Sequence, residues 1–184
     1  MATTALLIID MQQAIDDAKW GARNNPDAEA NTSKLLGYWR TCGLPVVHIR
    51  HDSVEPGSPY RPGQPGHAFK DLVAPFEYEK VIGKATNNAF IHTGLNDYLV
   101  DNDINALVMC GVLTQHSVDT TARMAASLGY RVLVVSDATA ATGVKDGRGK
   151  VWTADDVHAL TVAHLAADYA TIATTADILA GFEV

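Results

Sequence analysis

The chain has 184 residues, of which 47% are hydrophobic, and its 14 basic and 21 acidic residues leave a formal charge of −7 at pH 7. This size and composition are typical of one folded domain, here residues 1–184, that forms its core without disulfides or a structural metal. An acidic chain with no Lys/Arg cluster has little to neutralise a phosphate backbone or an anionic membrane, so we expect a small-molecule ligand and neither of those partners.

The first half of the chain contains three apolar runs and one helical pattern. Residues 5–9 and 44–49 are apolar nearly throughout, as strands covered on both faces should be, and 80–83 is a weaker strand expected nearer an edge. Helical spacing covers residues 28–39. The stretch 52–75 holds five of the seven prolines and has no periodicity, so we expect a loop over the edge of the sheet, where sites usually form.

The middle of the chain continues the alternation. A helix is expected over residues 93–100, a buried strand over 106–110 and another over 131–135. Between the two strands, apolar residues recur at helical spacing after Ser117, and Gly129 follows as a C-cap.

The last part of the chain begins with the glycine-containing run 147–150, which lacks the full glycine spacing of a phosphate-binding loop and is interpreted as a turn. The helix expected over 153–168 opens with a capping sequence at Thr153, and 170–173 is a second weak strand. Strands alternating with helices around one sheet predict a doubly wound α/β domain with right-handed crossovers.

Three polar residues stand at the carboxyl ends of the predicted strands, where ligands of open α/β sheets bind. Asp10 follows the first strand, Lys84 follows 80–83, and Ser117 opens the helix after 106–112. Singly, each has an ordinary structural explanation: a turn former, a surface charge and a helix cap. Together they offer a carboxylate, an ammonium and a hydroxyl to one site, which is a base, cation and nucleophile set.

Several blocks of the sequence resemble the isochorismatase-like cysteine hydrolases. The resemblance covers residues 5–179 and rests on the order and spacing of these blocks: residues 7–12, Lys84 with 88–90 and 93–95, and 111–118 with 121–122 and 129–130. It implies a six-stranded, mostly parallel sheet flanked by helices. It also implies a hydrolase that needs no cofactor.

In such a hydrolase Asp10 is the general base, Lys84 balances the charge of the site, and Ser117 stands at the nucleophile position. The resemblance further implies a cis peptide between Val112 and Leu113, with the backbone N–H groups of Leu113 and Ser117 as an oxyanion hole. The reaction it implies is hydrolysis of a small amide-type C–N bond through a covalent intermediate.

Ser117 departs from the family pattern, which has a cysteine there, and no His/Asp relay is evident in the motifs to activate a hydroxyl. Either the chain is an engineered Cys→Ser variant, or it is a natural member that makes no covalent step. We favour the first because residues 114–118 otherwise have the form of the cysteine version, and we expect weak activity or none. The alternatives are isochorismatase-type vinyl-ether hydrolysis with Asp10 as general acid, and a non-catalytic binding protein on the same scaffold.

The expected substrate-binding residues flank these three positions or lie in loops. Arg50 or Arg61 is a candidate for binding a substrate carboxylate, and the sequence does not choose between them. The six expected lining residues are Gln12, Trp20, Tyr60, Asn88, Phe90 and His116.

Other chemistry is less well supported. Cys110 lies within an apolar strand and is interpreted as a buried hydrophobic residue, and two cysteines are too few for a disulfide framework. His48 and His51 point to opposite faces of a strand, so we expect no metal site.

The apolar run 5–9 has no basic flank, which excludes a signal peptide and favours the cytoplasm. The resemblance also implies dimers or tetramers, and the apolar candidates for an interface are Trp152 and the alanine-rich segment 163–167.

Overall fold

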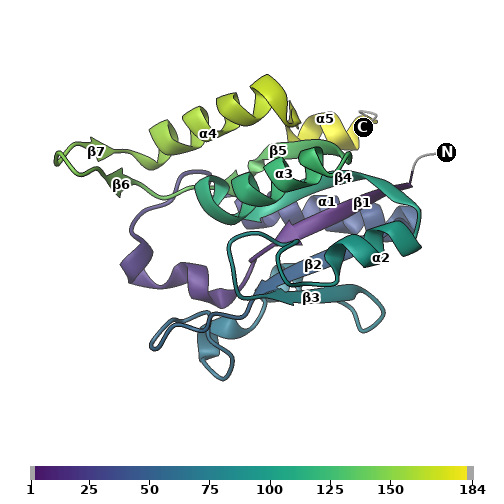
Figure 1. Ribbon diagram of the computed structural model, residues 1–184, viewed down its shortest axis with the longest axis horizontal. Coiled ribbons are helices and arrows are strands. Elements are labelled where there is room, and N and C mark those ends of the chain that lie inside the picture. The colour runs from purple at the N-terminus through teal and green to yellow at the C-terminus, as the bar shows by residue number, and fades with distance from the viewer. Residues whose placement is uncertain (1–2, 182–184) are drawn as a thin grey trace.

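Six parallel strands form the central sheet of the computed structural model, which describes residues 3–181 (Figure 1). The expected domain 1–184 thus includes residues 1, 2 and 182–184, which lie outside the described residues. The strand order is β3-β2-β1-β4-β5-β8, with the strong strands in the centre and the weak ones at the edges, as predicted. The strands are β1 (Thr3–Ile9), β2 (Val46–His51), β3 (Lys80–Lys84), β4 (Ile104–Val112), β5 (Arg131–Ala140) and β8 (Thr171–Ala173).

Helices cover both faces of this sheet (Figure 1). One face packs against α1 (Ala28–Cys42) and α5 (Thr175–Leu179). The other carries α2 (Leu95–Asp101), α3 (Asp119–Ser127) and α4 (Ala154–Asp168). No helix within residues 3–181 combines the length and the apolar character that crossing a lipid bilayer requires.

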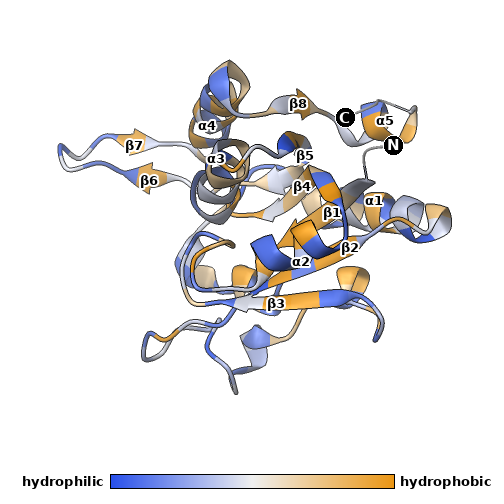
Figure 2. Ribbon diagram, turned by 45° about the vertical axis from the view of Figure 1, so that its right-hand side comes forward, coloured by the Kyte–Doolittle hydropathy of each residue, from blue (hydrophilic) through white to orange (hydrophobic). Residues whose placement is uncertain are grey.

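The two hydrophobic cores follow from the alternation of side chains along the strands. Leu6 and Ile8 of β1 belong to the core beneath α1, while Leu7 and Ile9 belong to the core beneath α2, α3 and α4. All four are buried, and the hydropathy colouring shows the central strands as mostly hydrophobic (Figure 2). Strands buried on both faces therefore appear in the sequence as continuous apolar runs.

Two predicted helix ends have the expected cap geometry. Gly129 has a φ of +93°, a conformation that favours glycine, and the next N–H, that of Tyr130, donates to the carbonyl of Ala125 across the end of α3. At the start of α4, Thr153 and Asp156 form a capping box in which each side chain accepts from the backbone N–H of the other.

The structure corrects several boundaries. The helix expected from Thr93 begins at Leu95, because the Thr93 hydroxyl accepts from the N–H of Leu95 and ends the preceding turn. The strand expected over 131–135 continues to Ala140, and α5 was not predicted. The turn at 147–150 lies in a hairpin of two short strands, β6 (Val144–Lys145) and β7 (Val151–Trp152), which are too short to show a periodicity.

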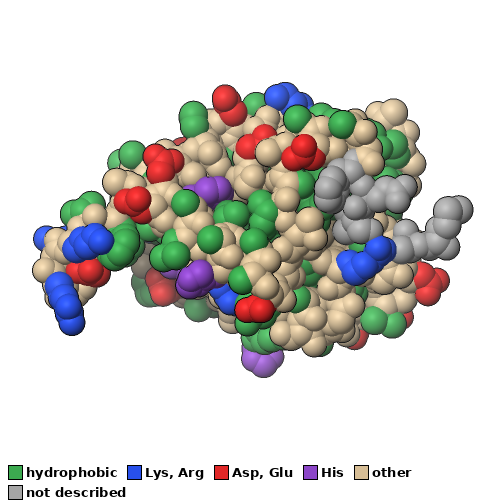
Figure 3. Space-filling model, turned by 90° about the horizontal axis from the view of Figure 1, so that it is seen from above, with side chains coloured by type: hydrophobic (Ala, Val, Ile, Leu, Met, Phe, Trp, Pro, Cys, Tyr) green, Lys and Arg blue, Asp and Glu red, His purple; other side chains and the backbone are tan. Residues whose placement is uncertain are grey.

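This hairpin projects from the body of the molecule beside α4 (Figure 1). Basic side chains gather on it, as the view from above shows (Figure 3). The sequence places Lys145, Arg148 and Lys150 there. Trp152 is half-buried beneath the ammonium of Lys150, and most of residues 163–167 are exposed on α4, so association through these residues stays a prediction.

Gly111 allows the ends of β1 and β4 to approach each other closely. Its φ is +131°, and a Cβ at this position would collide with the backbone of Ile9 on β1. The register between β4 and β5 also shifts between Met109 and Gly111. Only glycine fits here, and the close approach brings Asp10, the residue after β1, next to the turn that follows β4.

Candidate active site

A cavity of about 390 Å³ lies at the carboxyl ends of the strands. It is at the point where the strand order reverses, because β1 continues to β2 and β3 on one side and β4 continues to β5 and β8 on the other. Ligands of open α/β sheets bind at this kind of position. Asp10 after β1 and Ser117 after β4 both line the cavity.

The carboxylate of Asp10 is the centre of the polar cluster in this cavity. Its Oδ2 accepts a hydrogen bond from Oγ of Ser117 at 2.6 Å and one from Nζ of Lys84 at 2.7 Å. The residue has a φ of +53°, a left-handed conformation that Asp tolerates better than most residues. The other carboxylate oxygen, Oδ1, is buried and has no hydrogen-bond partner within residues 3–181. Three residues far apart in sequence therefore meet on one oxygen atom.

Lys84 is a buried cation at the end of β3, with 2% of its surface exposed. Besides Asp10, its Nζ lies 3.1 Å from Oγ of Ser117, 3.1 Å from the carbonyl oxygen of Thr86 and 3.4 Å from Nδ1 of His51. A buried ammonium is tolerated only when it is paired and hydrogen-bonded, and this set of acceptors satisfies it. The sequence reasoning that most lysines are solvated does not apply to this one.

Ser117 lies in the turn between β4 and α3 and is 4% exposed. This turn, Thr114–Val118, is a short π-helical segment that follows a cis peptide bond between Val112 and Leu113. The Ser117 hydroxyl does not cap α3, because it donates to the Asp10 carboxylate. The turn also contacts α4, because Oγ1 of Thr114 lies 3.0 Å from Nδ1 of His158 on that helix.

Three of the six expected lining residues line the cavity. The rings of Trp20 and Tyr60 meet edge to face with centroids 6.0 Å apart, and His116 lies within the turn Thr114–Val118, next to Ser117. Burial lowers the pKa of His116 below its ordinary value and raises that of Tyr60 well above its ordinary value, so both are neutral at pH 7. Leu113, the expected second oxyanion donor, also lines the cavity.

The other three expected lining residues do not line it. Gln12 is fully buried and bonds to the backbone of His51 and His67. Asn88 caps its own loop and donates to the carbonyl of Thr120, and the ring of Phe90 stacks on Tyr130. These expectations were wrong because nearness in sequence to Asp10 or Lys84 does not determine where a side chain points.

The basic side chain at the rim of the cavity is a lysine and neither of the two arginines that we expected to bind a substrate carboxylate. Neither Arg50 nor Arg61 lines the cavity, and Arg50 pairs with Asp52, its Nε lying 2.8 Å from Oδ1. The lysine on the rim is Lys19, whose Nζ lies 4.5 Å from the ring centre of Trp20. The loop expected over 52–75 also contributes to the wall of the cavity. Its four lining residues were not among the expected ones: Ser53, Val54, Glu55 and Ser58.

His51 is the most informative of the missed residues. It is the last residue of β2, lines the cavity and lies next to Lys84. The strand-end rule that selects Asp10 and Lys84 also applies to His51, so the signal was present in the sequence. The pairing of His51 with His48 as possible metal ligands does not indicate this position.

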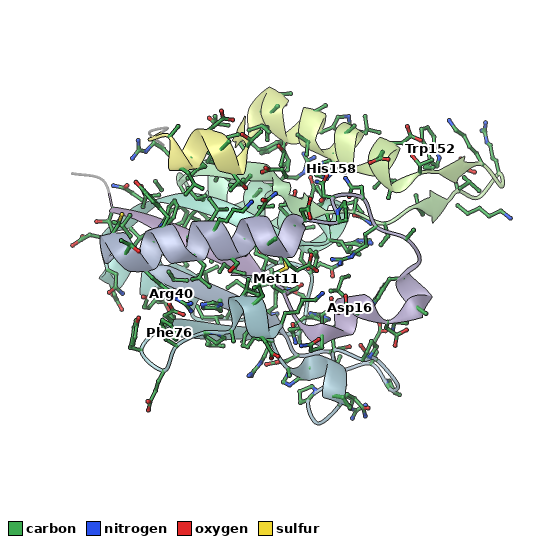
Figure 4. All side chains as sticks on the ribbon, turned by 180° about the vertical axis from the view of Figure 1, so that it is seen from behind. Met11, Asp16, Arg40, Phe76, Trp152 and His158 are labelled. Carbon is green, nitrogen blue, oxygen red and sulfur yellow. The ribbon has the colours of Figure 1, made fainter. Side chains whose placement is uncertain are left out.

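The structure separates the two histidines of β2. His48 is buried, with Nε2 2.9 Å from Oε2 of Glu79, which also accepts from Arg40. The guanidinium of Arg40 lies 3.6 Å from the ring centre of Phe76, so this cluster joins α1 to the loop before β3 (Figure 4). Within residues 3–181, no three His, Cys, Asp or Glu side chains gather closely enough to hold a metal ion.

Cys110 lies within β4 and is fully buried. Burial raises the pKa of its thiol to about 12. A thiol with such a pKa has almost no thiolate at neutral pH, so Cys110 is not a nucleophile.

Comparison with known proteins agrees with this architecture. The sequence model of the Isochorismatase domain matches residues 4–177. An uncharacterised isochorismatase family protein of Bacillus subtilis (strain 168), YrdC, is 42% identical over 97% of this chain and 95% of its own. Streptothricin hydrolase of Streptomyces noursei is 36% identical over 77% of this chain, which corresponds to 58% of that protein. The crystal structure of an isochorismatase-family protein from Chromobacterium violaceum ATCC 12472 superposes with a TM-score of 0.94 at 51% identity, covering 97% of this chain and 92% of the other.

Proposed function

This chain belongs to the isochorismatase family of hydrolases, and on that basis we propose that its site is built to cleave the amide-type C–N bond of a small molecule. The observation that carries the proposal is the shared oxygen: Oδ2 of Asp10 accepts from both Ser117 and Lys84 at the floor of the cavity. A carboxylate in this position can take the proton of a nucleophile at residue 117 and return it to a leaving group. Streptothricin hydrolase, a hydrolase by its name, is a relative of this chain.

In the proposed reaction, Asp10 accepts the proton of the side chain at position 117 as that side chain attacks the amide carbonyl carbon. The carbonyl oxygen becomes an oxyanion, for which the N–H groups of Leu113 and Ser117 are the proposed donors. The C–N bond then breaks, and Asp10 gives its proton to the departing nitrogen. Water next attacks the acyl group and gives one proton to Asp10. The bond from the acyl carbon to the side chain at position 117 then breaks, and Asp10 returns its proton to that side chain, which restores the starting state. Lys84 keeps the buried carboxylate charge compensated throughout.

The chemistry at position 117 determines the rate. A thiol beside a cation has a lowered pKa and reacts as thiolate. A serine hydroxyl is a far weaker acid, although here it donates a hydrogen bond to Asp10 and accepts one from Lys84. We therefore propose that the chain with Ser117 turns over amides slowly or not at all. Its site still holds a nucleophile position in the correct contact with the base.

The test measures ammonia release from a panel of small primary amides by the Ser117 chain and by the variants Ser117→Cys and Ser117→Ala. We expect ammonia release by Ser117→Cys to exceed that of the Ser117 chain, and Ser117→Ala to be inactive. No ammonia from any amide with Ser117→Cys would overturn the proposal. Vinyl-ether hydrolysis that survives Ser117→Ala but not Asp10→Asn would instead favour the isochorismatase-type reaction. Ligand binding without turnover in any variant would favour a binding protein.

A further inference from the structure

His51 occupies a position between the cavity and the buried cation. Its Nδ1 lies 3.4 Å from Nζ of Lys84, and its ring meets that of Tyr60 edge to face with centroids 5.5 Å apart. The residue lines the cavity, and no protein atom within residues 3–181 forms a hydrogen bond with its Nε2. The ring thus contacts the catalytic cluster through one nitrogen and leaves the other unpaired.

The backbone of His51 is held on both sides by one buried side chain. Gln12 accepts from the N–H of His51 at 2.7 Å and donates to its carbonyl oxygen at 3.2 Å. The same amide donates to the carbonyl oxygen of His67 at 2.9 Å, and Gln12 is 0% exposed. Because a buried amide costs free energy unless its bonds are made, this arrangement fixes where His51 lies.

We infer that His51 is a positioning residue for the proposed amide hydrolysis, acting through Lys84: its neutral ring accepts a hydrogen bond from the ammonium and directs it toward Asp10 and Ser117. The ammonium has three protons and four nearby acceptors, so each acceptor influences its orientation. Removing the acceptor at His51 leaves Lys84 nearer Thr86 and less well aimed at the nucleophile. The effect of His51 on the reaction rate rests on the proposed function. The contact between His51 and Lys84 does not depend on it.

This role requires one tautomer and one charge state. An Nδ1 that accepts from Lys84 carries no proton, so the neutral ring holds its proton on Nε2. Four charged groups act electrostatically on the ring, and Lys84 is the one in contact with it: Lys84, Asp10, Asp52 and Glu55. Burial and then the Lys84 cation lower the pKa of His51 below its ordinary value, and the three carboxylates oppose this only in part. Protonation at lower pH would place two cations side by side and remove the acceptor.

The contact can be tested in the Ser117 chain without any activity. Ring ¹⁵N chemical shifts across a pH titration report the tautomer and the pKa of His51. We expect the Nε2–H tautomer and a pKa below the ordinary value of histidine, and we expect Lys84→Met to raise this pKa. An Nδ1–H tautomer, or a pKa at or above the ordinary value, would overturn the inference.

The effect of His51 on amide hydrolysis is tested in the Ser117→Cys background, because that variant is expected to have a measurable amidase rate. His51→Asn keeps an amide oxygen near the place of Nδ1, whereas His51→Leu has no acceptor. We expect His51→Leu to lose about ten- to a hundredfold in kcat with little change in KM, as for one lost hydrogen bond to a charged group. His51→Asn should keep most of the rate and lose the part of the decline of kcat at low pH that comes from protonation of His51.

Equal losses in both variants with an unchanged pH profile would show a merely structural role and contradict the inference. If Ser117→Cys has no amidase activity, the proposed function fails, but the ¹⁵N titration still decides whether His51 is the neutral acceptor of Lys84. The two failures are therefore distinguishable.

Discussion

The ammonium of Lys84 lies 2.7 Å from Oδ2 of Asp10, and both side chains are buried at the end of the sheet. Breaking such a pair by removing one partner leaves an unpaired charge in a site with little solvent. We expect Asp10→Asn and Lys84→Met each to lower the free energy of unfolding by about 3 to 5 kcal/mol, and the double variant to cost clearly less than the sum. Urea denaturation of the three variants measures this coupling.

The partly exposed pair of Asp119 and Arg123 on α3 is the control. Nε of Arg123 lies 2.9 Å from Oδ1 of Asp119, as close as the atoms of a buried pair, but both side chains are in contact with solvent. Surface pairs of this kind contribute roughly 0.2 to 1 kcal/mol, so Asp119→Asn and Arg123→Met should change the stability little. Additive costs at the buried pair would show that Asp10 and Lys84 do not stabilise each other.

Thiol reactivity distinguishes the nucleophile position from the native cysteines. Cys42 is exposed and Cys110 is buried, so iodoacetamide should label only Cys42 in the native chain at neutral pH. In Ser117→Cys, the cation of Lys84 lowers the pKa of the new thiol, which we expect to react about tenfold faster than Cys42. Mass spectrometry of the labelled peptides follows both rates.

Adding Lys84→Met to the same variant should slow labelling at position 117 and leave that of Cys42 unchanged. Rapid labelling of Cys110 in the folded native chain would contradict the interpretation of that residue as part of the core. Labelling at position 117 no faster than at Cys42 would mean that the cluster does not activate a thiol.

The sequence predicted the fold and the three central side chains because both depend on strands. Apolar runs identify buried parallel strands, and the polar residue at the end of each run lies at the common edge where ligands bind. Asp10 and Lys84 are found by this rule, and Ser117 follows its strand by a single turn. The short hairpin and α5 were missed because elements of two and five residues show no periodicity.

The cavity wall could not be predicted in the same way. Residues 53–60 have no regular spacing, and their position depends on hydrogen bonds such as the one from the N–H of Ser53 to the carbonyl oxygen of Tyr60. Gln12 shows the same limit: its place beside Asp10 suggested a cavity residue, but its amide is used to hold the backbone of β2 and the loop. Such long-range bonds are not encoded in local patterns.

Gln12 therefore provides a test of how the loop is held. Gln12→Leu removes three hydrogen bonds and leaves backbone groups of His51 and His67 without partners, so we expect a loss of roughly 3 kcal/mol in stability. Amide exchange over residues 51–60 should become faster. Gln13→Leu, next to it on the exposed surface, is the control and should change neither. Unchanged exchange in Gln12→Leu would show that other contacts hold the loop.

The rim of the cavity predicts a preference among substrates. Lys19 lies over the ring of Trp20 at 4.5 Å and lines the cavity, so it can attract a substrate carboxylate to the entrance. Because Lys19 is exposed, its attraction is screened by solvent and weak. In the Ser117→Cys background, we expect Lys19→Ala to raise KM about two- to fivefold for amides that carry a carboxylate, with kcat and neutral amides unaffected.

Ionic strength separates this attraction from a change in cavity shape. An electrostatic contribution of Lys19 should fade as salt rises, because the charges at the rim are screened. The KM values of Ser117→Cys with and without Lys19→Ala should therefore converge at about 1 M salt. Arg61→Ala removes an exposed cation that does not line the cavity and should leave KM unchanged. If Lys19→Ala changes KM equally for neutral and anionic amides, or independently of salt, Lys19 acts by shaping the wall around Trp20. If Arg61→Ala changes KM, the anion site lies instead at Arg61 in the outer loop.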